Sequence, residues 1–111
     1  MRGVVSNRPR YVCEALTKAV RDYPCQHCDA DDGTVCAAHS NWPEHGKGGA
    51  RKADDVFIAA MCFRCHSWLD QGKGRDPTGV WDDTEKKEVW RRAHDKTLLR
   101  LFIDGRLRIA A

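Results

Sequence analysis

The stretch CFRCH at residues 62–66 decides the fold that we expect for this chain. An earlier stretch, CQHC at residues 25–28, has the same Cys-x-x-Cys spacing. A tight turn brings the two thiolates of such a pair together, and two pairs complete the tetrahedral ligand set that Zn²⁺ prefers. The sequence therefore predicts one structural zinc ion, held by Cys25, Cys28, Cys62 and Cys65.

The interval between the two pairs, residues 29–61, is longer than in an ordinary zinc ribbon and must contain an inserted segment. A Cys-x-x-Cys pair can also be a redox dithiol, but the βαβ pattern of thioredoxin-like proteins is missing around both pairs. Of the neighbouring side chains, Cys13 and Cys36 are expected to pack as small hydrophobic residues, and His27 is expected to face solvent.

The chain has 111 residues, which suffices for a single small domain. Its longest apolar run, residues 56–63, is far shorter than the roughly 20 residues that span a bilayer. Without an apolar N-terminal segment we expect no export, a cytoplasmic location and metal-binding rather than disulfide-bonded cysteines. The composition argues against a membrane protein, a large multidomain enzyme and a disordered tail. The net charge of +3 fits an ordinary surface as well as a nucleic-acid partner.

Hydrophobic periodicity predicts an α+β chain. It has one helical stretch near each end and, between them, two short apolar stretches on either side of a polar, glycine-rich loop. The expected elements are a flexible lead-in over 1–8, a helix over 9–22, strands over 34–39 and 56–61, a helix over 65–71, a helix over 83–103 and a terminal strand over 106–109.

Three polar side chains near the cysteine pairs suggest chemistry. His66 and Asp70 are four residues apart, so a helix places both on one face, where they can hold a divalent cation or form a simple hydrogen-bonded pair. His39 ends the first expected strand and can act as a general base. A base beside a divalent metal suits phosphodiester hydrolysis, because the base deprotonates a water and the metal neutralises the charge that develops.

The order of CQHC (25–28), AHSN (38–41) and MCFRCH (61–66) resembles that of HNH endonucleases with cysteine knuckles, which have the ββα-metal, treble-clef-like fold. The chain is most similar to small HNH nucleases encoded by phages and prophages. The similar stretches are AHSNWPEHGKGGARKADD (38–55), AAMCFRCHSWLDQG (59–72) and WRRAHDKTLLRLF (90–102).

The resemblance covers residues 25–103 of what we expect to be a single domain over residues 1–111. It implies a ββα-metal core over 25–72, flanked by an N-terminal helix and a long C-terminal helix. It also implies cleavage of DNA in a bacterial cell, with His39 as the general base. His66 would bind a catalytic Mg²⁺, Mn²⁺, Ni²⁺ or Zn²⁺, and phage or host recombination or replication proteins are candidate partners.

The chain departs from the HNH pattern at two positions. Ala38 stands where an Asp or His usually binds the metal, and Phe57 stands where the middle Asn usually lies. Asp54 and Asp55 are the nearest polar replacements and could orient His39 or bind the metal. The other candidates for the site are Asp70, His45, Asn41 and His39 itself.

The glycine-rich loop carries Lys47, Arg51 and Lys52, which can bind phosphates or remain solvated. Trp42 is a candidate for stacking on a base. Because Ala38 and Phe57 weaken the expected metal shell, the alternative function is a zinc-dependent nucleic-acid-binding or adaptor module without catalysis.

Overall fold

Two short strands at the centre of the molecule, β1 (Cys36–His39) and β2 (Ile58–Met61), pair antiparallel, with Cys36 opposite Met61 and His39 opposite Ile58. A two-stranded sheet of this size is marginal by itself, so its stability depends on the helices around it. All four residues of β2 are buried, which explains why this strand reads as a continuous apolar run.

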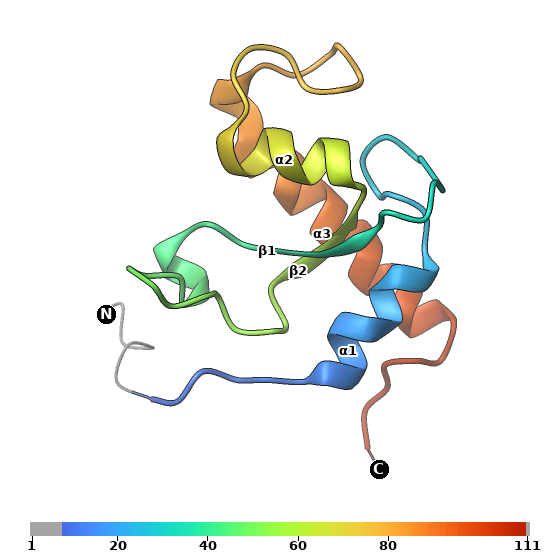
Figure 1. The fold of residues 1–111 in the computed structure, drawn as a ribbon. Coiled ribbons are helices and arrows are strands. Elements are labelled where there is room, and N and C mark those ends of the chain that lie inside the picture. The colour runs from blue at the N-terminus through green and yellow to red at the C-terminus, as the bar shows by residue number, and fades with distance from the viewer. Residues whose placement is uncertain (1–7, 111) are drawn as a thin grey trace.

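The structure, a computed structural model, describes residues 8–110, so the lead-in predicted over 1–8 lies, apart from Arg8, outside the described residues. Within this range the chain forms an α+β fold, as expected, with the elements drawn in Figure 1. Besides the two strands, the elements are α1 (Glu14–Ala19), α2 (Phe63–Gln71), α3 (Lys86–Ile103) and the 3-10 turns η2 (Val20–Asp22), η3 (Pro43–His45) and η4 (Asp83–Glu85).

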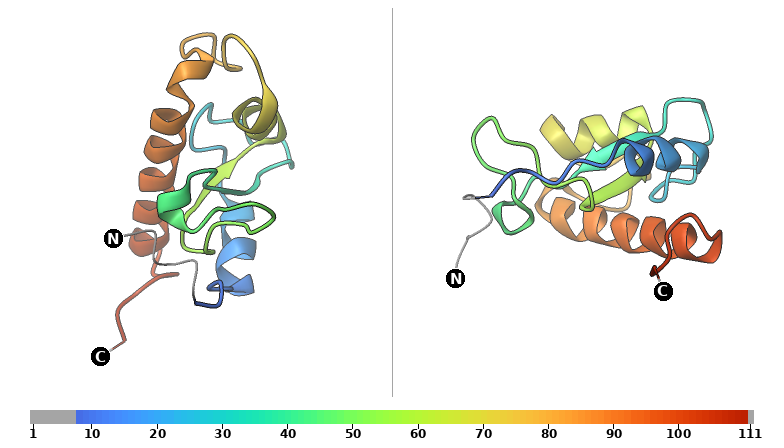
Figure 2. Two further views of the ribbon diagram at one scale, coloured as in Figure 1. Left: turned by 90° about the vertical axis from the view of Figure 1, so that its left-hand side faces the viewer. Right: turned by 90° about the horizontal axis from the view of Figure 1, so that it is seen from below.

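Helix α3 covers one face of the hairpin, and α1 and α2 lie on the opposite side (Figure 2). The Trp90 indole N–H donates to the carbonyl of Ala38 at 2.9 Å, and the Ala60 N–H donates to the Thr97 hydroxyl at 3.0 Å. These two bonds satisfy backbone groups of the short sheet that would otherwise be buried without partners. They also fix where β1 ends, and therefore where His39 lies.

The buried residues of α3 recur at helical spacing and form the stripe that the sequence predicts. Trp90 and Leu101 are almost fully buried, and Met61 of β2 and Val20 of η2 join them in the same core. The helices predicted over 65–71 and 83–103 and the strands predicted over 34–39 and 56–61 are present, with somewhat different ends.

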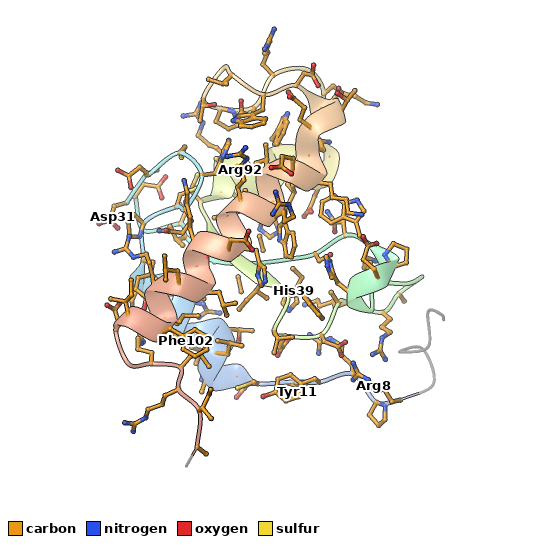
Figure 3. All side chains as sticks on the ribbon, turned by 180° about the vertical axis from the view of Figure 1, so that it is seen from behind. Arg8, Tyr11, Asp31, His39, Arg92 and Phe102 are labelled. Carbon is orange, nitrogen blue, oxygen red and sulfur yellow. The ribbon has the colours of Figure 1, made fainter. Side chains whose placement is uncertain are left out.

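The helix predicted over 9–22 is wrong in its first part, because α1 begins only at Glu14. Two aspartates hold the preceding residues: the Tyr11 N–H donates to Asp54 Oδ1 at 2.7 Å, and the Cys13 N–H donates to Asp55 Oδ2 at 2.8 Å. The Asp55 N–H in turn donates to the Tyr11 carbonyl. Arg8 and Tyr11 therefore lie on a segment that runs along one edge of the molecule (Figure 3).

The terminal strand predicted over 106–109 is also wrong. The N–H groups of Arg106 and Leu107 both donate to the carbonyl of Leu101, so the chain turns back on the end of α3. Of the apolar residues after Gly105, Leu107 packs against the core beside the helix end, whereas Ile109 is exposed. None of the helices in the described range has the length and apolar character needed to cross a membrane.

Candidate metal centre and active-site cavity

The four predicted cysteines meet at one point between the turn after η2 and the junction of β2 with α2. Their four sulfur atoms all lie within 4.8 Å of one another, and Cys28 Sγ and Cys62 Sγ are 3.6 Å apart. Sulfurs around a tetrahedral Zn²⁺ are about 3.8 Å apart, given Zn–S bonds near 2.3 Å. The cluster could therefore bind a structural metal such as zinc. Among residues 8–110 it is the only group of three or more such ligands that converges in this way.

Backbone bonds shape the cysteine cluster before any metal is considered. The Cys25 N–H donates to Ala30 O and the Gln26 N–H to Ala60 O, which joins the first turn to strand β2. A hydrogen bond from Cys65 lowers the pKa of Cys25 to about 4, whereas the same bond and burial raise the pKa of Cys65. Metal binding would require all four thiols of the cluster to be deprotonated.

The prediction that His27 faces solvent is wrong. Its imidazole forms a largely buried hydrogen bond with Asp76, which lies in the loop between α2 and η4. Burial alone would raise the pKa of Asp76, but hydrogen bonds from His27, from the Trp81 N–H and from Thr78 hold it well below its ordinary value. The pair joins the first cysteine turn to a loop that is distant in sequence.

A cavity of about 480 Å³ is lined by residues of β1 and of the helices α1 and α2, but not by residues of α3 or β2. Its walls come from the N-terminal segment, α1, η2, β1, the glycine-rich loop and α2. Both histidines that the sequence singles out for chemistry, His39 and His66, line it. The other predicted residues that line it are Asp55, Asp70, Asn41, Lys47 and Lys52.

His39 is held by Asp55, the nearer of the two aspartates that the sequence suggested. Its Nε2 lies 2.8 Å from Asp55 Oδ1, and Arg10 lies 2.6 Å from the same oxygen. Burial would raise the pKa of Asp55, but the bonds from His39 and the Cys13 N–H keep it below its ordinary value. The carboxylate therefore accepts the Nε2 proton and leaves Nδ1 of His39 with a free lone pair.

Asp54 has a different role from Asp55, although the two are adjacent and similarly buried. It forms ion pairs with Arg8 at 2.9 Å and with Arg51 at 3.4 Å. Arg51 also donates to the carbonyl of Gly46, so it closes the base of the glycine-rich loop. The structure thus places Arg51, a predicted phosphate ligand, in an internal contact outside the cavity lining.

His66 lies in a row of four hydrogen-bonded side chains. Its Nε2 is 3.2 Å from Asp70 Oδ2, and its Nδ1 is 3.2 Å from Cys36 Sγ. Asn41 donates to the other oxygen of Asp70 at 2.9 Å. The bond to Asp70, together with that to Cys36, raises the pKa of His66 to about 10. The predicted pair of His66 and Asp70 is therefore in contact, but His39 is not within ligand distance of both.

His45 and Trp42 lie outside the cavity lining. The His45 ring stacks on Phe57 at 4.5 Å between centroids, and its Nδ1 is 2.6 Å from the buried Ser40 hydroxyl. Burial lowers the pKa of His45. Trp42 packs against Trp90 and lies under the Lys87 ammonium. Phe57, for which the HNH resemblance predicted an asparagine, packs against His45.

Three residues of the cavity were missed or undervalued by sequence reasoning. Arg10 and Arg21 line it beside Lys47 and Lys52, which gives the cavity four basic side chains. Cys36 was expected to be buried as a small hydrophobic residue, but it is only half-buried and contacts His66. Strand periodicity could not have exposed this error, because Cys36 and the fully buried Ala38 are two residues apart and therefore point to the same face of β1.

Comparison with protein-family models, with curated proteins and with solved structures found no match to this chain. The geometry of the cluster and of the cavity is therefore the basis for a functional conclusion.

Proposed function

We propose that this chain is a metal-dependent endonuclease of the phage or prophage HNH type, which hydrolyses phosphodiester bonds in DNA. One observation carries the proposal: His39 and His66 line the same cavity as four basic side chains, Arg10, Arg21, Lys47 and Lys52. A general base, a metal ligand and phosphate-binding cations are the groups that phosphodiester hydrolysis requires.

In this proposal His39 is the general base. Asp55 fixes the ring through Nε2, so the lone pair on Nδ1 takes a proton from the attacking water. Asp55 does not act on the substrate itself. It keeps the imidazole in one tautomer and stabilises the imidazolium that forms, as a carboxylate does in other histidine dyads.

His66 belongs to the proposed second metal site in the same cavity. A divalent ion bound there would supply positive charge for the phosphate and for the leaving oxygen. The four-cysteine cluster would hold a structural zinc ion. Because Cys65 and His66 are adjacent, this zinc would fix the start of α2 and thereby the direction of His66.

Plasmid nicking tests the function directly. Supercoiled DNA is incubated with the zinc-containing protein and Mg²⁺, Mn²⁺, Ni²⁺ or Zn²⁺, and wild type is compared with His39→Ala. Loss of the general base is expected to slow cleavage about 100- to 10,000-fold. His94→Gln is the matched control, because His94 packs on α3 outside the cavity. Equal cleavage by wild type and His39→Ala would rule out His39 as the base.

A second candidate is a zinc-dependent nucleic-acid-binding or adaptor module without catalysis. The arrangement of the metal ligands favours this candidate. In residues 8–110 the four cysteines are the only group of three or more ligand side chains that converges, so a second, catalytic metal has no comparable set of ligands. Ala38 is also fully buried and provides no ligand beside His39.

This candidate predicts salt-dependent DNA binding and no cleavage with any of the four metals. A second metal equivalent that disappears in His66→Ala would argue against it. Plasmid nicking by wild type that depends on His39 would exclude it.

A further inference from the structure

The half-buried thiol of Cys36 is the group in the cavity that the proposed chemistry does not use. It lies on β1 and faces the Nδ1 atom of His66 at 3.2 Å. The other side of the imidazole is held at 3.2 Å by Asp70, which is itself held at 2.9 Å by Asn41. The histidine is therefore fixed between a sulfur and a carboxylate, and each contacts a different ring nitrogen.

This order of contacts is the one found around metal-binding histidines. Such a histidine coordinates through one nitrogen and donates from the other to a carboxylate, which sets the tautomer and strengthens the ligand. Here Asp70 is the carboxylate on Nε2, so Nδ1 is the nitrogen left for a metal. Cys36 Sγ is the nearest ligand atom on that side.

We propose that Cys36 Sγ and His66 Nδ1 are the two protein ligands of the second divalent metal, and that Asp70 is a positioning residue rather than a ligand. A tetrahedral ion bound by a thiolate and an imidazole holds the two ligand atoms about 3.6 Å apart. The present separation of 3.2 Å needs to open by only a few tenths of an ångström.

The remaining coordination positions of such an ion point into the cavity, because Cys36 and His66 both line it. Water or a phosphate oxygen can fill them. A thiolate with an imidazole favours Zn²⁺, Co²⁺ or Ni²⁺ over Mg²⁺, which prefers oxygen ligands. These ligands therefore restrict the metals expected in the cavity to Zn²⁺, Co²⁺ and Ni²⁺.

The inference rests on the proposed function only in the role it gives to the ion. Metal binding at Cys36 and His66 is measured without DNA, so its failure is separate from a failure of cleavage. If nicking depends on His39 while Cys36 plays no part in metal binding, the endonuclease stands and this assignment of ligands is wrong.

The test is titration of the zinc-containing protein with Co²⁺, followed by absorption spectroscopy and metal analysis of the same samples. Wild type is expected to retain its zinc, to bind a further cobalt equivalent and to show a sulfur-to-cobalt charge-transfer band. Cys36→Ser and Cys36→Ala should both lose this band, and Asp70→Asn should keep it with about 10- to 100-fold weaker binding.

Cys13→Ser is the matched control, because Cys13 is the other cysteine outside the cluster and does not line the cavity. It should behave like wild type. A total of one metal per chain in wild type, or an unchanged charge-transfer band in both Cys36 variants, would overturn the proposal. In that case the contact between Cys36 and His66 is only a hydrogen bond.

Discussion

The four-cysteine cluster and the cavity meet at two adjacent residues, Cys65 and His66, yet they are built in different ways. The cluster uses one kind of ligand from two short turns, and three of its four side chains are fully buried. The cavity combines imidazoles, carboxylates, a thiol and basic groups from six segments, and most of its polar groups are partly exposed.

This difference separates structural stability from reactivity. Buried thiolates require a cation, so a metal bound by the cluster would contribute its binding energy to folding. The groups around the cavity are instead fixed by hydrogen bonds to neighbours, such as the bond between His39 and Asp55. Such bonds can be changed singly without dismantling the fold, so the two regions should respond differently to mutation.

Loss of the cluster metal should have the largest effect. Cys65→Ser removes one ligand of the buried cluster. In small domains a structural zinc ion contributes about 10 kcal/mol or more to folding. We expect the variant to lose bound zinc and its cooperative thermal transition, as measured by metal analysis and circular dichroism. Cys13→Ser, which changes a cysteine outside the cluster, should keep both. A cooperative, zinc-free Cys65→Ser protein would contradict the structural role.

The support of His39 should matter next, and it should matter for cleavage more than for folding. Asp55→Asn removes the carboxylate that aligns the ring, and misalignment of a catalytic group costs about 100-fold in rate. Asp54→Asn is a close control, because Asp54 is equally buried and binds Arg8 and Arg51 instead. Plasmid nicking and thermal unfolding are measured for both. Similar rates for the two variants would show that Asp55 does not position the base.

The hydrogen-bonded pair of His27 and Asp76 should have a moderate effect on stability alone. Because the pKa of Asp76 is held below its ordinary value, the carboxylate stabilises the fold at neutral pH and loses this effect only in acid, below about pH 4. Asp76→Asn should lower the free energy of unfolding by about 2 kcal/mol in urea at neutral pH. Asp31→Asn, at an exposed position, should change it by less than about 0.5 kcal/mol.

The smallest effect should come from a single basic residue of the cavity. Lys52→Gln is expected to reduce the slope of log K against log salt concentration for DNA binding by about 1. The loss of affinity should be similar for every DNA sequence tested. Lys96→Gln makes the same charge change on the exposed side of α3, away from the cavity. Fluorescence anisotropy at several salt concentrations measures both. Equal slopes for the two variants would place the DNA elsewhere.

The parts of the fold that were predicted correctly are those with a local cause. The helix from Phe63 and the long helix over residues 86–103 follow from apolar spacing within each segment. The failures have distant causes: the start of α1 is delayed because Asp54 and Asp55, more than 40 residues away, accept bonds from the N-terminal backbone. No periodicity within residues 9–13 carries that information.

The candidate site divides in the same way. The convergence of Cys25, Cys28, Cys62 and Cys65 was predicted from their spacing, because a Cys-x-x-Cys turn aligns its own thiolates. The contact of Cys36 with His66 was not, since it depends on how strand β1 lies against α2. The contact of Arg10 with Asp55 has a similar cause, because it joins two segments that are far apart in the sequence.

By itself the sequence determined most of the elements and the kinds of ligand in this protein: two cysteine pairs, a histidine at the end of the first strand, another after the second cysteine pair, and helices with one apolar face. The tertiary structure decided which polar groups meet. It selected Asp55 rather than Asp54 for His39, withdrew Arg51 into the base of a loop and brought Cys36 to His66. Local spacing fixes turns and helix faces, because these involve only a few neighbouring residues. Side-chain pairing depends instead on how the elements pack. Packing leaves few buried polar groups without partners, and that condition applies to the whole chain.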